Sequence, residues 1–178
     1  MLPRAFTATQ NIVAKATQVY RVLDEQRDIF ESHRHHVFSV AYYMTGDERE
    51  AETVLQSTFM QAFEEDPRPS ADHLDQKLMG ELRSRMSFEP VAPVVVAHEG
   101  SQGLGGKNVR RTDMEEALWQ LPEQERLCFL LRDVEGYKPE RIAEVLAISE
   151  SDVQRTVLSA RLRIRGLLME QRSAALSS

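Results

Sequence analysis

The stretch PERIAEVLAISESDVQRTVLSARLRIRGLL, from Pro139 to Leu168, decides how this chain folds. Pro139 stands where the first residue of a helix is expected, and the apolar spacing predicts a short helix over Arg141–Leu146. A turn of three residues, Ala147–Ser149, follows. Ser149 and Asp152, three positions apart, form a capping-box-like start for a longer helix.

The longer helix combines an apolar stripe with a concentration of positive charge. Asp113–Asp152 holds 4 basic and 11 acidic residues, whereas Val153–Arg172 holds 5 basic residues and 1 acidic residue. A short helix joined by a tight turn to a basic second helix is typical of a helix-turn-helix. Apolar residues at helical spacing predict the buried face of the second helix: Val153, Val157, Ala160, Ile164 and Leu167.

The outward face of this helix is the predicted DNA-binding surface. A helix whose N-terminal end enters the major groove offers side chains to base edges, while arginines further along contact phosphates. Gln154 and Arg155 are the predicted base readers. The alternative is that the arginines only solvate the outer face of an amphipathic helix. The predicted DNA-binding residues are Ser151, Gln154, Arg155, Leu158, Arg161, Arg163 and Arg165.

The whole chain has the size and composition of a soluble globular protein. It has 178 residues, of which 42% are hydrophobic and 28% charged, with a formal net charge of -6. This length suits one ordinary domain or two small ones. The longest uncharged apolar run, Val91–Ala97, contains Pro93 and falls far short of the roughly 20 residues that cross a bilayer. We therefore expect a cytoplasmic protein without membrane insertion.

Neither a metal site nor a catalytic constellation emerges from the residue pattern. Cys128 is the only cysteine, so it has no disulfide partner within the chain, and a buried inert thiol is predicted. His33 and His36 share a predicted helix face and could bind a metal, but no Glu-x-x-His motif accompanies them, which favours a solvated basic face. We expect no enzymatic activity, no cofactor and no small-molecule substrate.

One segment of distinct composition divides the chain. Phe88–Lys107 contains two prolines and four glycines, which predicts a flexible linker. On either side, hydrophobic residues recur at helical spacing without the alternation typical of strands. The predicted fold is all-α, with two small helical domains joined by the linker. The predicted segments are an N-terminal helical extension (1–27), a first domain (28–86), the linker (87–112), a helix-turn-helix domain (113–172) and a tail (173–178).

Apolar spacing and capping signals also place the remaining helices. Four are predicted before the linker, and the third begins after a stop at Thr45–Asp47. Two more precede the helix-turn-helix. The predicted ranges are Asn11–Gln26, Asp28–Met44, Glu48–Glu64, His73–Arg85, Met114–Gln120 and Glu123–Val134.

Several of these stretches resemble a known family. The sequences ALWQLPEQER (117–126), FLLRDVEGY (129–137) and IAEVL (142–146) resemble region 4 of extracytoplasmic-function (group 4) sigma factors. Upstream, AYYMTGD (41–47), EAE (50–52) and QSTF (56–59) are similar to region 2 of that family. The resemblance covers about 28–86 and 113–169, and the predicted linker falls where such proteins join the two regions.

The resemblance implies a subunit that binds core RNA polymerase and brings it to promoter DNA. Region 4 would read the -35 element, and region 2 would hold the polymerase and help to open the -10 element. The helix around Ala51–Phe63 would contact the polymerase clamp. An anti-sigma factor is a further expected partner. The core-polymerase-binding residues that the resemblance implies are Glu52, Thr53, Gln56 and Phe59.

The chain departs from the family pattern at several charged positions, and these departures define an alternative. Thr53 and Ser57 stand where the family usually has acidic residues, and Asp152 stands where it commonly has Thr. Family members commonly have Arg at the positions of Thr156 and Ser159. The alternative is a sigma-like adaptor or decoy that binds an anti-sigma factor or another regulator with little DNA binding. A third reading is a simple helix-turn-helix repressor in which residues 1–27 supply a dimer surface.

Overall fold

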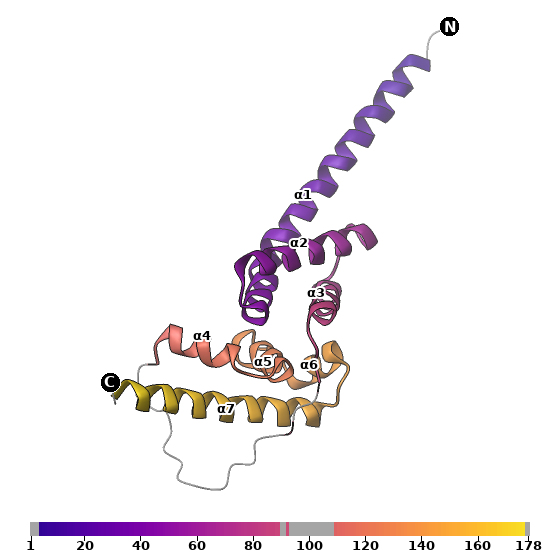
Figure 1. Ribbon diagram of the computed structural model, residues 1–178. Coiled ribbons are helices and arrows are strands. Elements are labelled where there is room, and N and C mark those ends of the chain that lie inside the picture. Colours follow the sequence, from indigo (N-terminus) through magenta and orange to yellow (C-terminus); the bar gives the residue numbers. More distant parts are fainter. Residues whose placement is uncertain (1–3, 90–91, 93–108, 177–178) are drawn as a thin grey trace.

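The computed structural model describes residues 4–89, 92 and 109–176, without the side chains of 4–14, 16 and 174–176. Every regular element within these ranges is helical, as predicted (Figure 1). Most of the predicted linker lies outside the described residues. The elements are α1 (Arg4–Thr45), α2 (Glu48–Glu65), α3 (Ala71–Arg85), α4 (Arg111–Trp119), α5 (Glu123–Phe129), a π-helical turn η1 (Leu130–Val134), α6 (Pro139–Leu146) and α7 (Glu150–Leu176).

The first helix differs from the prediction. Two helices, Asn11–Gln26 and Asp28–Met44, were expected, but α1 is one uninterrupted helix of 42 residues. The polar sequence around Arg27 contains neither glycine nor proline, so nothing there breaks the backbone hydrogen bonds of the helix. The N-terminal part of α1 projects away from the rest of the molecule (Figure 1).

The C-terminal part of α1 packs with α2 and α3 into a small bundle, called here the N-terminal half. Asp47 caps α2, because its carboxylate accepts a hydrogen bond from the backbone N–H of Glu50 at 2.9 Å. Ser70 caps α3 in the same way through the N–H of His73. The buried core of this half consists of Val37, Val40, Ala41, Met44, Ala51, Val54, Phe59, Ala62, Leu74, Leu78, Met79 and Leu82.

Helices α4 to α7 form the C-terminal half, and the predicted helix-turn-helix is confirmed there. Pro139 opens α6, and Ala147 ends it in the left-handed conformation with φ 56°. The hydroxyl of Ser149 accepts a hydrogen bond from the N–H of Asp152 at 3.1 Å, which caps α7. Val153, Val157, Ala160 and Ile164 of the predicted stripe are buried, and α7 continues to Leu176.

The two halves pack directly against each other. Helix α1 contacts α4 and α5, and α3 contacts α6. The ring of Trp119 on α4 packs edge-on against Tyr42 of α1, with 6.2 Å between the ring centroids. Arg126 of α5 is buried and donates to the carbonyl of Met44 at the end of α1 at 2.8 Å. None of the helices in the described ranges is long and apolar enough to cross a membrane.

Candidate nucleic-acid interface and the contact between the two halves

The N-terminal part of α7 presents the predicted base-reading face to solvent. Ser151, Gln154 and Arg155 are exposed, and Leu158 is 57% exposed. These positions lie opposite the apolar stripe that packs on α4, α5 and α6. The structure thus brings four of the predicted residues together on one outward face beside the turn of the helix-turn-helix, which is the geometry that enters a major groove.

The arginines of α7 are engaged with carboxylates of the same half. Arg155 forms an ion pair with Asp152, and the hydrogen bond of Asp152 with Ser149 and this pair lower the pKa of Asp152. The guanidinium of Arg161 donates to both oxygens of Asp133, at 2.8 and 2.5 Å. The guanidinium groups of Arg155 and Arg161 are thus paired within the protein.

Two of the predicted positions are half-buried rather than exposed. Arg163 is half-buried, and its Nε lies 2.9 Å from an oxygen of Glu125, which is 3% exposed. Arg165 is also half-buried. Ser159 is buried and donates to Glu125 at 2.8 Å. The position of Ser159, where the family commonly has Arg, therefore faces the interior in this protein.

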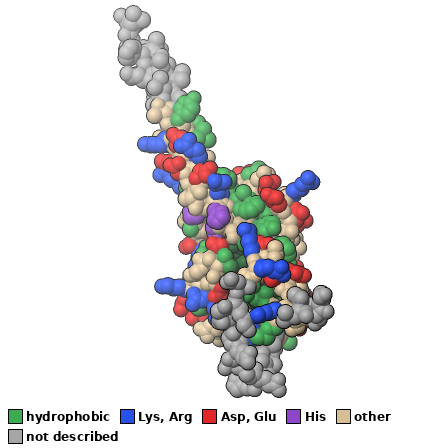
Figure 2. Space-filling view, turned by 90° about the vertical axis from the view of Figure 1, so that its left-hand side faces the viewer, with side chains coloured by type: hydrophobic (Ala, Val, Ile, Leu, Met, Phe, Trp, Pro, Cys, Tyr) green, Lys and Arg blue, Asp and Glu red, His purple; other side chains and the backbone are tan. Residues whose placement is uncertain are grey.

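Acidic and basic side chains are interspersed over the face of the molecule that Figure 2 shows, and no single basic area dominates it. This agrees with the net charge of -6. A protein that binds nucleic acid mainly through phosphates concentrates positive charge on one face. The face that Figure 2 shows carries no such concentration.

The predicted polymerase contacts lie along one side of α2. Glu52, Thr53 and Gln56 are exposed, whereas Phe59 is only 4% exposed. Gln56 and Phe59 line a shallow, mainly apolar groove of about 470 Å³ between α1 and α2. Sequence reasoning missed the other lining residues, although helical spacing from Gln56 could have found two of them. They are Phe30, Met60, Phe63 and Glu64.

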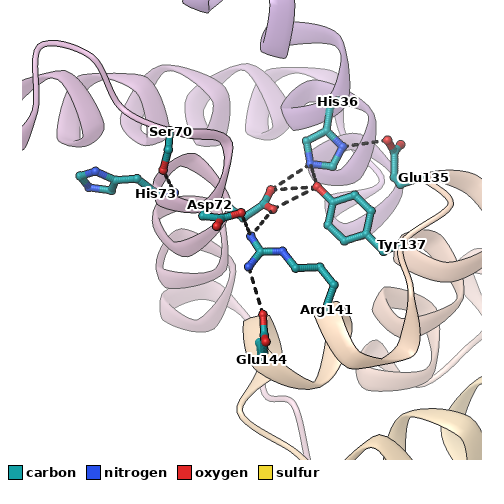
Figure 3. A network of polar contacts seen from close by, with 9 residues as sticks. His36, Ser70, Asp72, His73, Glu135, Tyr137, Arg141 and Glu144 are labelled. Atoms are coloured by element: carbon teal, nitrogen blue, oxygen red, sulfur yellow. Dashed lines mark hydrogen bonds and ion pairs between the residues drawn. The ribbon is translucent and has the colours of Figure 1, made fainter.

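A cluster of polar side chains joins the two halves around Asp75 of α3. Figure 3 shows His36, Tyr137 and Arg141 of this cluster. Asp75 is 4% exposed. Its carboxylate accepts hydrogen bonds from the hydroxyl of Tyr137 at 3.0 Å, from Nη2 of Arg141 at 3.0 Å and from Nε2 of His36 at 3.1 Å. Buried carboxylates need such partners, because an unpaired one is costly. These hydrogen bonds lower the pKa of Asp75 against the effect of burial, so the carboxylate stays ionised.

His36 lies between two carboxylates from different halves. Its Nδ1 is 2.7 Å from Glu135, and its Nε2 faces Asp75. Burial alone would lower the pKa of His36, but the hydrogen bonds to Asp75 and Glu135 outweigh it and raise the pKa to about 9. Both ring nitrogens therefore donate at neutral pH. The prediction of a solvated face was wrong for His36, because residues that are distant in sequence cover it.

Cations of α3 are also engaged within the protein. Lys77 pairs with Glu65, and Arg85 pairs with Glu81 at 3.3 Å. Arg83 donates to the carbonyl of Leu146, the last residue of α6, at 3.0 Å.

The sequence also singles out the lone cysteine and a candidate metal site. Cys128 is fully buried, as predicted, and burial raises the pKa of its thiol to about 12. Within the described residues, no group of three or more His, Cys, Asp or Glu side chains could hold a metal ion.

Comparison with known proteins agrees with this architecture. Residues 111–164 match the family model of Sigma-70, region 4. The ECF RNA polymerase sigma factor SigE of Mycolicibacterium smegmatis is 21% identical over 192 residues, which cover 96% of this chain and 72% of SigE. The Positive control factor of Bacillus subtilis is 32% identical over 91 residues, and the match spans 51% of this chain and about half (47%) of that relative.

Two solved structures share the fold. The sigma factor RpoE of Bartonella quintana, in complex with the anti-sigma factor NepR, gives a TM-score of 0.62 at 20% identity and covers 80% of this chain and 96% of RpoE. PhyRSL of Sphingomonas sp. Fr1, in complex with NepR, gives 0.53 at 18% identity and covers 78% and 86%. The C-terminal half thus carries the match to the family model of Sigma-70, region 4, over residues 111–164. The resemblance to extracytoplasmic-function sigma factors is confirmed.

Proposed function

We propose that this protein is a sigma factor that binds core RNA polymerase and directs transcription initiation in the cytoplasm. The observation that carries the proposal is the helix-turn-helix of α6 and α7, which lies within the region 4 match and turns Gln154 and Arg155 outward. In this proposal α7 reads the -35 element and the N-terminal half contacts polymerase and the -10 element. The protein acts through protein and DNA contacts, without catalysis.

The apolar groove between α1 and α2 supports the proposed polymerase contact. Its walls include Phe59 and Met60, and Met60 is 62% exposed. Exposed apolar side chains beside a groove are typical of sites that bind a helix of a partner protein. The neighbouring carboxylate of Glu52 is exposed and suits a basic partner surface.

Reconstituted transcription tests this function without a known promoter. Host core polymerase is incubated with pooled genomic fragments, with and without the protein, and the RNA 5′ ends are mapped by sequencing. We expect new starts that share upstream -35 and -10 sequences. A Met60→Ser variant should give fewer starts, because it removes an exposed apolar contact without opening the core. Absence of new starts from folded protein would contradict the proposal.

A second function is favoured by the paired charges. Arg155 and Arg161 are neutralised within their own half, and Lys77 and Arg85 are neutralised on α3. These pairings suit a sigma-like adaptor that binds an anti-sigma factor and has little affinity for DNA. RpoE and PhyRSL, which share the fold, were both solved in complex with the anti-sigma factor NepR. An anti-sigma factor is therefore a proposed partner under either function.

The same transcription experiment separates the two functions. An adaptor would give no new starts, yet it would form a complex of defined stoichiometry with a candidate anti-sigma factor from the same genome, measured by calorimetry. It would also restore transcription by a second sigma factor that this anti-sigma factor inhibits. A protein that gives new starts by itself is not merely an adaptor.

A further inference from the structure

Helix α6 is the part of the helix-turn-helix that contacts α3. In helix-turn-helix proteins the second helix enters the major groove, and the first helix crosses the DNA backbone. Here α6 is that first helix, and it packs against α3 of the other half. The guanidinium of Arg141 in α6 turns toward α3 rather than toward solvent, as Figure 3 shows.

Two carboxylates of α3 contact this guanidinium, and Glu144 of α6 itself lies further away, 3.6 Å from Nη1. Nη2 of Arg141 lies 2.6 Å from Asp72 and 3.0 Å from Asp75. A guanidinium binds the oxygens of a carboxylate and of a phosphate with the same donor geometry. Asp72 and Asp75 therefore give Arg141 the contacts that a DNA phosphate would otherwise give.

The C-terminal end of α6 is also contacted by α3. Nη2 of Arg83 on α3 lies 3.0 Å from the carbonyl oxygen of Leu146 and 3.5 Å from that of Val145. These carbonyls end α6 immediately before the turn into α7. The contact with α3 thus spans α6 from its first turn to its last residue.

The position of Asp75 makes this contact persistent. Asp75 is buried and is held ionised by His36 and Tyr137, so it cannot simply turn into solvent. Asp72 is different, because its side chain is 70% exposed. One fixed anion and one exposed anion together neutralise the cation of α6.

We propose that α3 is an autoinhibitory element: Asp72 and Asp75 take the place of DNA phosphates at Arg141, so the helix-turn-helix binds DNA fully only after the two halves separate. The inference rests on the proposed DNA binding by α6 and α7. It does not depend on promoter recognition or on polymerase. Any partner that moves α3 away from α6 would release DNA binding.

The test compares the full-length protein with its Asp72→Asn/Asp75→Asn variant on a short DNA duplex of arbitrary sequence. Fluorescence anisotropy over a range of salt concentrations measures affinity, and small-angle X-ray scattering measures whether the halves separate. We expect a larger radius of gyration, at least about tenfold tighter binding and a salt dependence steeper by about one unit, as one gained phosphate contact gives.

A matched control removes the same number of carboxylates elsewhere. Asp24 pairs with Arg27 within α1, and Asp113 of α4 pairs with Arg110, the residue that precedes α4. An Asp24→Asn/Asp113→Asn variant should bind the duplex much less tightly than the Asp72→Asn/Asp75→Asn variant. Asp72→Asn alone, at an exposed position, retains the fold and should give a smaller gain in the same direction. Circular dichroism verifies the helical content of each variant.

Separation of the halves without tighter binding would overturn the proposal, and so would an equal gain in the control. Halves that stay together in a folded variant with unchanged affinity would overturn it too. Failure of the proposed sigma function has a different signature. In that case the variant gains affinity for the arbitrary duplex, but neither protein gives new starts with core polymerase.

Discussion

Two aspartate–arginine contacts in this protein have the same chemistry and opposite surroundings. Asp152 and Arg155 lie one turn apart on the outward face of α7, where the Arg155 side chain is 67% exposed. Asp75 and Arg141 join α3 to α6, and Asp75 is 4% exposed. Exposed pairs contribute little to stability, whereas removal of one partner of a buried pair is costly. The first pair is thus available for exchange with DNA, and the second maintains the contact between the halves.

The largest expected effect comes from Asp75→Ala. This change leaves His36 and Arg141 at the contact without their shared anion, and we expect the free energy of unfolding to fall by about 3–5 kcal/mol. Urea denaturation followed by circular dichroism measures it. Asp113→Ala is the control, because the Asp113 side chain is 26% exposed and pairs locally with Arg110, the residue that precedes α4. Equal losses in the two variants would show that burial does not distinguish these contacts.

The pH dependence of stability should follow the same buried cluster. The pKa of His36 is raised from 6.5 to about 9, so its protonated form stabilises the folded state. This contribution is fully present below about pH 6.5 and is lost as pH rises through about 9. It amounts to at most about 3 kcal/mol. Asp75, whose pKa is lowered, contributes stability that is lost in acid as pH falls through its folded pKa.

Thermal unfolding between pH 6 and pH 9.5 measures this dependence. The charged and titratable groups that face His36 come from three elements: Asp75 on α3, Glu135 after η1, and Tyr137 before α6. We expect the melting temperature to fall across this range in the native protein and to stay nearly level in a His36→Gln variant. A parallel decline in both proteins would assign the dependence to other groups.

The exposed face of α7 is tested by Arg155→Ala. If Arg155 reads a base, the variant should bind a cognate -35 duplex more weakly by about 1–3 kcal/mol, while its stability stays close to that of the native protein. Arg111→Ala is a suitable control, because Arg111 is an arginine of α4 whose side chain is 82% exposed. An affinity that is unchanged in both variants would exclude Arg155 as a base-reading residue.

Local sequence signals predicted most of the fold because they act over a few residues. Asp47 and Ser149 each start a helix through contacts within the next turn, and both starts were placed correctly. Pro139 stands at the first helical position as expected, although the helix was predicted only from Arg141. The predicted break in α1 was wrong, since polar residues near Arg27 only expose a helix and do not end it. Ser70, the cap of α3, lies just before a start that was predicted at His73.

The site was only partly predictable, for a physical reason. Helical periodicity identifies the outward face of α7, because the residues of one face are set by the 3.6-residue repeat. The partners of these residues come from other elements. Arg161 meets Asp133 of η1, and His36 meets Asp75 and Glu135, which are 39 and 99 positions away. Such contacts depend on how the two halves pack, and no short-range pattern encodes them.

The smallest expected effect concerns Asp152→Asn. The pKa of Asp152 is lowered by its hydrogen bond with Ser149 and by Arg155, yet its side chain is 43% exposed, so we expect a barely changed melting temperature. DNA binding should respond instead, because loss of the carboxylate frees Arg155 for phosphates or bases and removes an anion beside the DNA. Anisotropy titrations at several salt concentrations should show tighter binding with a steeper salt dependence. Weaker binding would mean that Asp152 positions Arg155 for the DNA rather than competing with it.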